Sequence, residues 1–215
     1  MGSDMEVTLV DHMGSDLSVV NAARVSFSKT SKWETIPEAG PTPGLLKEGD
    51  EKLIKFLAKH DHWSPFGHAS MQFHIKAPVF VARQLVKHQV GLVWNEVSRR
   101  YVDYEPEEWR LAAENKKLGS SDETTPYDVS ATHMHARSTY TAMLKVGIAP
   151  EMARMVLPQS MMTEWYWSGT LYAFARVCNL RCKPDAQVET QMVANEIDKL
   201  AEDLFPYSWE ALRDG

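Results

Sequence analysis

Two stretches of the chain alternate polar and apolar residues, which is the pattern of a half-buried β-strand. Residues 6–10 (EVTLV) form the first stretch, and residues 70–76 (SMQFHIK) form the second. The apolar residues of the second stretch share one face of the expected strand: Met71, Phe73 and Ile75. Residues 93–101, which follow the helix-ending Gly91, are also expected to be extended. The pattern predicts a small antiparallel sheet.

Longer stretches repeat apolar residues at helical spacing. Helices are expected over residues 18–24, 45–59, 79–89, 131–145, 149–157, 161–177 and 184–204. Pro78 fits the first turn of the third of these helices, where its missing N–H costs nothing. Residues 37–44 are rich in proline and glycine and are expected to form a loop.

The elements together predict an α+β fold in which long helices pack on the small sheet, with residues 1–215 forming a single domain. The acidic, polar residues 106–130 are expected to form a surface excursion from that domain.

Composition narrows the class of protein. The chain has 215 residues and a formal net charge of −6, so no overall basic field attracts nucleic acid. No apolar run approaches the roughly 18–20 residues that span a bilayer, and no secretory signal pattern is found. With only Cys178 and Cys182, a disulfide framework is excluded and a cytoplasmic location is expected.

Polar side chains gather on one side of the helix expected over residues 79–89. Arg83, Gln84, Lys87 and His88 share that side, which is also what the solvated face of an ordinary amphipathic helix looks like. The next run, residues 95–101 (NEVSRRY), adds further groups that bind anions and hydrogen-bonding ligands. Two adjacent polar elements of this kind suit a nucleotide.

Arginines also occur near the C-terminus, at Arg154, Arg176 and Arg181. Each could instead pair with one of the many acidic residues. His60, His62 and His68 fall close together, but no cysteine or carboxylate at zinc-like spacing accompanies them, so no metal site is expected. The two cysteines are expected to be structural thiols, and no G-x-G-x-x-G or P-loop motif occurs.

Residues 76–101 (KAPVFVARQLVKHQVGLVWNEVSRRY) closely resemble the signature of flavin-dependent thymidylate synthases, in which Arg-His-Arg is followed by Asn-Glu-x-Ser-x-Arg-Tyr. Further blocks of the chain resemble the same family: residues 23–27 (ARVSF), 62–68 (HWSPFGH), 153–158 (ARMVLP), 179–191 (NLRCKPDAQVETQ) and 206–212 (PYSWEAL). Their combined order is more specific than any one block.

The resemblance implies a homotetramer of α+β subunits, similar to thymidylate synthase complementing protein, with each active site built from several subunits. It implies reductive methylation of dUMP to dTMP, with methylenetetrahydrofolate as carbon donor, FAD as cofactor and NADPH as reductant. Reduced FAD would supply the hydride, which fits a chain whose cysteines lack the context of a catalytic nucleophile.

The resemblance also assigns residues, position by position. It assigns dUMP to Gln84, Lys87, Glu96, Val97, Ser98, Arg99, Arg100, Arg154 and Arg181. It assigns FAD to Ser64, Lys87, His88, Gln89, Glu96, Thr170 and Arg176. It implies catalytic roles for Arg181, Ser98 and His62, with Arg181 against the uracil ring and His62 where folate meets the flavin.

The chain departs from the family pattern at Lys87-His88-Gln89, which replaces Arg-His-Arg and removes two guanidiniums. Thr170 and Tyr172 also stand where the family has Asn and Arg. One alternative is therefore a non-catalytic dUMP-binding protein that has lost flavin use. A nucleic-acid-binding module, suggested only by the Arg99-Arg100 pair and the aromatic residues, conflicts with the acidic balance.

Overall fold

A four-stranded antiparallel sheet forms the centre of the computed structural model, which describes residues 4–37, 40–101, 107–109 and 128–213. The strands lie in the order β1 (Glu6–Met13), β4 (Ser70–Pro78), β6 (Met162–Thr170) and β5 (Leu92–Glu96). A separate two-stranded ribbon joins β2 (Thr35–Ile36) to β3 (Gly40–Pro41). Part of the loop expected at residues 37–44 is therefore strand.

The sheet has one buried and one polar face because successive side chains of β4 point in opposite directions. Met71, Phe73 and Ile75 are buried on one face, as the alternation predicts. On the other face His74 contacts Glu164, with 3.1 Å between Nε2 and Oε2. The α+β architecture with a small antiparallel sheet is confirmed.

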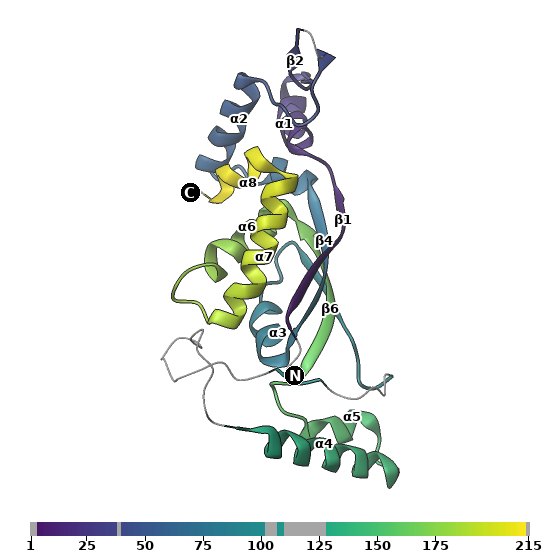
Figure 1. Cartoon of the computed structure of the whole chain (residues 1–215). Coiled ribbons are helices and arrows are strands. Elements are labelled where there is room, and N and C mark those ends of the chain that lie inside the picture. The colour runs from purple at the N-terminus through teal and green to yellow at the C-terminus, as the bar shows by residue number, and fades with distance from the viewer. Residues whose placement is uncertain (1–3, 38–39, 102–106, 110–127, 214–215) are drawn as a thin grey trace.

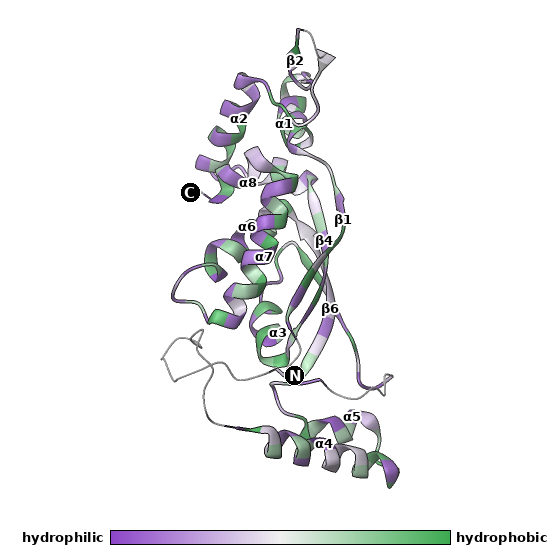
Figure 2. Ribbon diagram, in the orientation of Figure 1, coloured by the Kyte–Doolittle hydropathy of each residue, from purple (hydrophilic) through white to green (hydrophobic). Residues whose placement is uncertain are grey.

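Helices cover the buried face, as Figure 1 shows. The covering helices are α3 (Val79–Leu85), α6 (Leu171–Arg181), α7 (Val188–Leu204) and α8 (Pro206–Arg213). Figure 2 shows α3 as a largely hydrophobic helix, which fits its packing between β4 and α7. Phe73, Trp167 and Phe174 are fully buried and pack edge to face, with ring centroids 5.1 and 5.2 Å apart. This aromatic cluster joins the sheet to α6.

The remaining helices lie at the two ends of the elongated chain (Figure 1). One end holds α1 (Asp16–Arg24) and α2 (Glu48–Lys59), and the other holds α4 (Ser130–Lys145) and α5 (Pro150–Ala153). Asp16 links the first end to α8, since its carboxylate accepts from the backbone N–H of Ser208 at 2.8 Å. Burial raises the pKa of this carboxyl above 3.8, against the lowering effect of the hydrogen bonds from Ser208.

His133 fastens α4 to the segments before β6. Its Nδ1 lies 3.0 Å from Glu108 Oε2, and its Nε2 lies 2.9 Å from Ser160 Oγ. The ring is only 9 % exposed, so both contacts are largely shielded from water. Because α4 packs on α5 and on the 3₁₀ turn Arg154–Val156, this bridge also supports the position of Arg154.

Strand β5 approaches β6 very closely at Gly169. A Cβ atom there would lie 2.4 Å from Leu92 Cδ2 and 2.6 Å from the carbonyl oxygen of Gly91. Gly91 itself has φ of +76°, a left-handed conformation that favours glycine. Two glycines therefore allow the turn after α3 to sit directly against the end of β6.

One expected helix is wrong. Residues 161–177 divide into strand β6 and the first part of α6, with Thr170 as the N-cap where the strand ends and the helix begins. Burial alternates along β6, where Trp165 and Trp167 are buried and Tyr166 between them is exposed. The apolar density of this run suits a helix as well as a strand, which is why its composition was misleading.

Other boundaries differ by shorter lengths. Helix α3 ends at Leu85 instead of 89, and the extended run expected over residues 93–101 ends at Glu96. The helix expected over 149–157 is a short α-helix followed by a 3₁₀ turn. Most of the excursion expected over 106–130 lies outside the described residues. Within the part of the chain that the structure describes, no helix is long and apolar enough to cross a membrane.

Candidate functional site

The turn between α3 and β5 carries the altered triplet Lys87-His88-Gln89. These residues, with Arg176 of α6, line a hollow of about 180 Å³. Lys87 and Arg176 bring two positive charges to its walls, so the hollow suits an anionic group. The family resemblance implied that all four of these residues contact FAD, and the structure brings them together.

Arg181, the last residue of α6, reaches the same turn. Its Nε donates to Nε2 of His88 at 3.0 Å, so this ring nitrogen acts as the acceptor and His88 is neutral. Burial, reinforced by the charges of Arg181 and Arg176, lowers the pKa of His88 below its ordinary 6.5. The two terminal amino groups of Arg181 carry four further N–H donors that a ligand can use.

Gln84, on α3, is held by the start of α7. Its Nε2 donates to Oε1 of Gln187, the N-cap residue, and its Oε1 accepts from the hydroxyl of Thr190 at 3.2 Å. Thr190 is fully buried. The amide of Gln84 is therefore fixed in one orientation before any ligand arrives.

The residues after β5 form a turn, so they do not alternate as a strand. The carboxylate of Glu96 accepts from the hydroxyl of the buried Thr163 at 2.7 Å, and the backbone N–H of Val97 donates to the carbonyl of Glu164. Ser98 Oγ accepts from the backbone N–H of Arg100 at 3.3 Å. The extended run expected over residues 93–101 therefore does not reach Ser98 and Arg100, because the strand ends at Glu96.

Two nucleotide-binding candidates meet at Glu151 of α5. Arg100 Nε donates to its carboxylate at 3.1 Å, and Arg154 Nε donates to its backbone carbonyl at 3.2 Å. The Arg100–Glu151 pair is about half exposed on both sides. Arg99, which lies between Ser98 and Arg100 in the turn, is buried, with 5 % of its surface exposed.

His62 and Ser64 lie on the exposed segment after α2. This segment is tied to α6 because the hydroxyl of Tyr172 donates to Asp61 Oδ1 at 2.6 Å. Thr170, another expected flavin contact, has a structural role here: its Oγ1 accepts from the backbone N–H of Ala173 and caps α6.

The expected site residues thus form three groups in one chain. One group surrounds the α3–β5 turn and α6, a second lies around α5, and a third follows α2. Figure 1 shows α2 and α5 at opposite ends of the molecule. Within the described residues, no hydrogen bond or ion pair joins the Arg100–Glu151 pair to the Arg181–His88 pair.

Sequence reasoning missed the side chains that hold these groups: Gln187, Thr190, Thr163 and Glu151. Only Glu151 had a local signal, since it lies three residues before Arg154 and so on the same side of a helix. Thr163 and Thr190 bond to residues 67 and 106 positions away, which no local pattern reveals.

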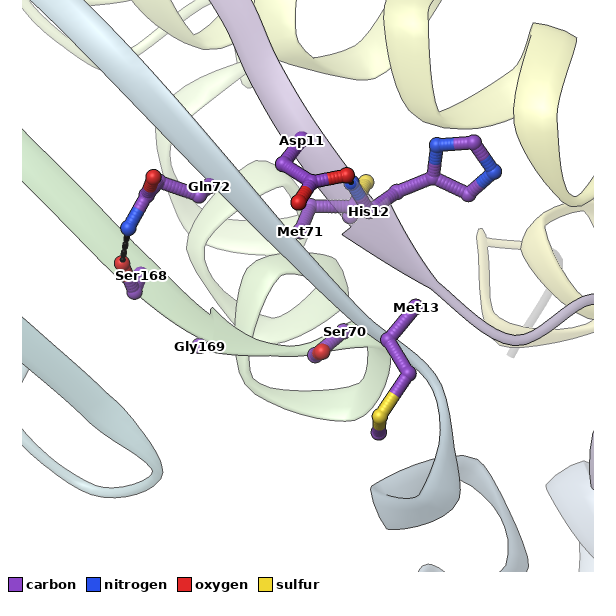
Figure 3. Close-up of a pocket in the computed structure, with 8 residues that line it drawn as sticks. All are labelled: Asp11, His12, Met13, Ser70, Met71, Gln72, Ser168 and Gly169. Carbon is purple, nitrogen blue, oxygen red and sulfur yellow. Dashed lines mark hydrogen bonds between the residues drawn. The ribbon is translucent and has the colours of Figure 1, made fainter.

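A second hollow, of about 210 Å³, lies where β1, β4 and β6 run side by side (Figure 3). Asp11, His12 and Met13 line one side, and Gln72 donates to Ser168 Oγ at 2.8 Å across β4 and β6. None of the expected site residues lines it.

The chain is also similar to proteins of known family. Residues 8–207 match the model of the family described as thymidylate synthase complementing protein. A flavin-dependent thymidylate synthase of Thermus thermophilus is 38 % identical over 97 % of this chain and 75 % of its own length. The corresponding protein of Kosmotoga olearia is 37 % identical over 95 % of this chain and 88 % of its own.

A solved structure is also similar. The UMP/dUMP methylase PolB from Streptomyces cacaoi, bound with 5-Br dUMP, superposes with a TM-score of 0.79 at 32 % identity. The match covers 98 % of this chain and 95 % of that one. The likeness therefore extends over sheet and helices alike.

Proposed function

Because the chain belongs to the thymidylate synthase complementing protein family, we propose that it converts dUMP to dTMP with methylenetetrahydrofolate, using FAD that NADPH reduces. It is an enzyme, a flavin-dependent thymidylate synthase that acts on dUMP, as its relatives and its structural neighbour indicate. What we propose beyond this is the use of methylenetetrahydrofolate and NADPH and the role of each individual residue.

The observation that carries the proposal is the position of Arg181. Its guanidinium is anchored through Nε to a neutral His88, next to a hollow lined by two further cations. An anchored guanidinium with its terminal donors available stabilises negative charge that develops on a ligand, at little cost in reorganisation. A uracil ring that becomes nucleophilic develops negative charge, which this guanidinium would stabilise.

The other side chains bind and orient. Lys87 and Arg176 fit the phosphates of FAD, which supplies the hydride when bound and reduced. Gln84 presents an amide fixed by Gln187 and Thr190, which suits the polar edge of a base. Arg100 and Arg154 fit the phosphate of dUMP, since arginine binds phosphate through paired hydrogen bonds.

We infer further that each active site combines residues from several subunits of a homotetramer. The support is that, within the described residues, no hydrogen bond or ion pair joins the group around Arg181 to the group around Arg154, which leaves each group incomplete as a nucleotide site. Mixing two inactive variants, Arg154→Ala and Arg181→Ala, tests this inference. Hetero-oligomers regain activity if the two residues meet across subunits. Oligomers that exchange subunits yet stay inactive would contradict it.

The principal experiment follows the flavin spectrum. Purified protein is mixed with FAD and titrated with dUMP, and dTMP formation is then measured with methylenetetrahydrofolate and NADPH. We expect a bound-flavin spectrum that shifts with dUMP, and dTMP that forms only when all components are present. UMP is titrated in the same way as a comparison ligand for dUMP, because the structural neighbour is named for both nucleotides.

The same experiment separates the alternative, a non-catalytic dUMP-binding protein, which the Lys87-His88-Gln89 triplet favours. In that case dUMP binds, measured by calorimetry, while no concentration of FAD gives a bound spectrum. The two outcomes exclude each other.

A further inference from the structure

The two cysteines meet an acidic residue of the next helix. Cys178 lies in the last turns of α6, and Cys182 caps that helix four residues later, so both thiols face the same side. Asp198 of α7 completes the group, and one ligand atom from each residue lies within 4.8 Å of the others.

Both cysteines are free thiols, and their ligand atoms lie close enough to that of Asp198 for one cation to contact all three. Metal–thiolate bonds of about 2.3 Å place the two sulfurs of a tetrahedral site about 3.8 Å apart. A disulfide requires sulfurs only about 2 Å apart. The thiol of Cys178 instead donates to the carbonyl oxygen of Ala194 at 3.6 Å.

Neighbours hold the carboxylate of Asp198 in place. Its Oδ1 accepts from Trp209 Nε1 at 2.9 Å and from Arg213 Nε at 2.8 Å. Its Oδ2 has only a long contact, 3.4 Å, with Nη2 of Arg213, which leaves this oxygen with lone pairs to donate. Hydrogen-bonded carboxylates of this kind are typical metal ligands, because outer partners fix their orientation.

Burial and hydrogen bonding have the largest effects on how the two thiols ionise. Burial raises the pKa of the Cys178 thiol, whereas the hydrogen bond from Cys178 lowers the pKa of Cys182. The negative charge of Asp198 raises the pKa of both thiols, and the positive charge of Arg213 opposes this with a smaller lowering. A cation that replaces the protons removes the penalty of a buried thiolate.

We propose that Cys178, Cys182 and Asp198 form a binding site for a thiophilic divalent cation such as Zn²⁺. The ion forms two metal–sulfur bonds and one metal–oxygen bond and displaces two protons from the thiols, with no change of oxidation state. Water or the Ala194 carbonyl supplies the fourth ligand. The bound ion fastens α6 to α7 at the turn from which Arg181 reaches His88.

Co²⁺ is the probe, because its spectrum reports both thiolate ligands and tetrahedral geometry. The full chain is titrated under argon in the presence of a phosphine reductant. We expect one Co²⁺ per chain with a thiolate charge-transfer band, and release of two protons per ion in weak buffer. Zn²⁺ should displace Co²⁺ and raise the thermal midpoint.

Cys182→Ser is the decisive variant, since Cys182 is only half-buried and serine preserves the helix cap. It should abolish the charge-transfer band while the far-ultraviolet circular dichroism stays unchanged. Asp203→Asn, an exposed carboxylate five residues further along α7, is the control and should bind Co²⁺ like the wild type.

Three results would overturn the proposal. The first is no thiolate band in the reduced wild type. The second is a band that survives Cys182→Ser, and the third is Co²⁺ bound in octahedral geometry without proton release, as at surface histidines. Proton release by the wild type tests the proposal even if Cys182→Ser fails to fold.

Discussion

The two arginine groups of the candidate site differ in how firmly the chain holds them. Arg181 extends from the end of a long, well-packed helix and bonds to a half-buried, neutral His88. Arg100 lies in a turn and pairs with Glu151, and both partners are about half exposed. One guanidinium is fixed before a ligand arrives, and the other can change partners.

The difference indicates a division of labour. Fixed donors contribute most where charge develops during a reaction, because no reorganisation is needed at that moment. Exposed ion pairs contribute only about 0–1 kcal/mol and exchange readily, which suits capture and release of a phosphate. The comparison therefore predicts large effects on turnover at Arg181 and small effects on binding around Glu151.

Replacement of Arg181 should produce the largest effect. Arg181→Ala is expected to lower kcat for dTMP formation by about 100-fold or more, as loss of a fixed charge-stabilising donor does. Arg181→Lys keeps the charge but lacks the planar fork, and it should recover only part of the activity. Lys199→Ala, an exposed cation on α7, is the control. A normal kcat in Arg181→Ala would remove the distinction between the groups.

Restoring the guanidiniums of the triplet comes next. Lys87→Arg combined with Gln89→Arg should tighten FAD binding by about tenfold, because paired hydrogen bonds to phosphate replace single ones. Flavin fluorescence quenching measures the affinity. Arg176→Gln is the opposite variant and should weaken FAD binding. If the double variant shows no gain, Arg176 already supplies the charge that the triplet lacks.

Glu151→Gln should produce a smaller change, and in the favourable direction. The carboxylate of Glu151 competes with the dUMP phosphate for Arg100, so its removal should tighten dUMP binding by up to about fivefold. Calorimetric titration measures this, with Glu202→Gln on α7 as the exposed control. Weaker binding would mean that Glu151 positions Arg100 for the ligand.

The smallest effect is expected in the pH dependence of stability. The folded-state pKa of His88 lies below 6.5, so the unfolded chain takes up its proton first as the pH falls. The free energy of unfolding should therefore decrease as the pH falls from 6.5 to the folded-state pKa. Urea midpoints at about pH 7.5 and about pH 5.5 should differ more in the wild type than in His88→Gln. Equal differences would contradict a neutral, anchored His88.

Periodic patterns of apolar residues, together with the blocks that resemble the family, predicted much of the architecture. The alternation at Met71, Phe73 and Ile75 located the central strand, and helical spacing located α4 and most of α7. Residues 161–177 were assigned wrongly because Trp165 and Trp167, the large buried groups of β6, belong to a strand that long-range pairing with β4 and β5 fixes. Such a strand and a buried helix have the same composition.

The residues of the candidate site were likewise predicted only in part. Motif resemblance identified Lys87, His88, Gln89 and Arg176, which the structure brings to one hollow. It could not identify Thr190 or Thr163, since their roles depend on the packing of distant elements. It also gave no indication that the strand would end at Glu96.

The close contact of Gly169 with Gly91 has an evolutionary consequence. Any side chain at position 169 would collide with the backbone of the turn that carries Lys87, His88 and Gln89. Substitutions at this strand position are therefore coupled to the turn proposed to bind FAD, although Gly169 itself has no side chain with which to bind a ligand. The side chains of Lys87 and Gln89 are exposed and can be replaced without a clash, whereas the position of the turn that carries them requires glycine at residue 169.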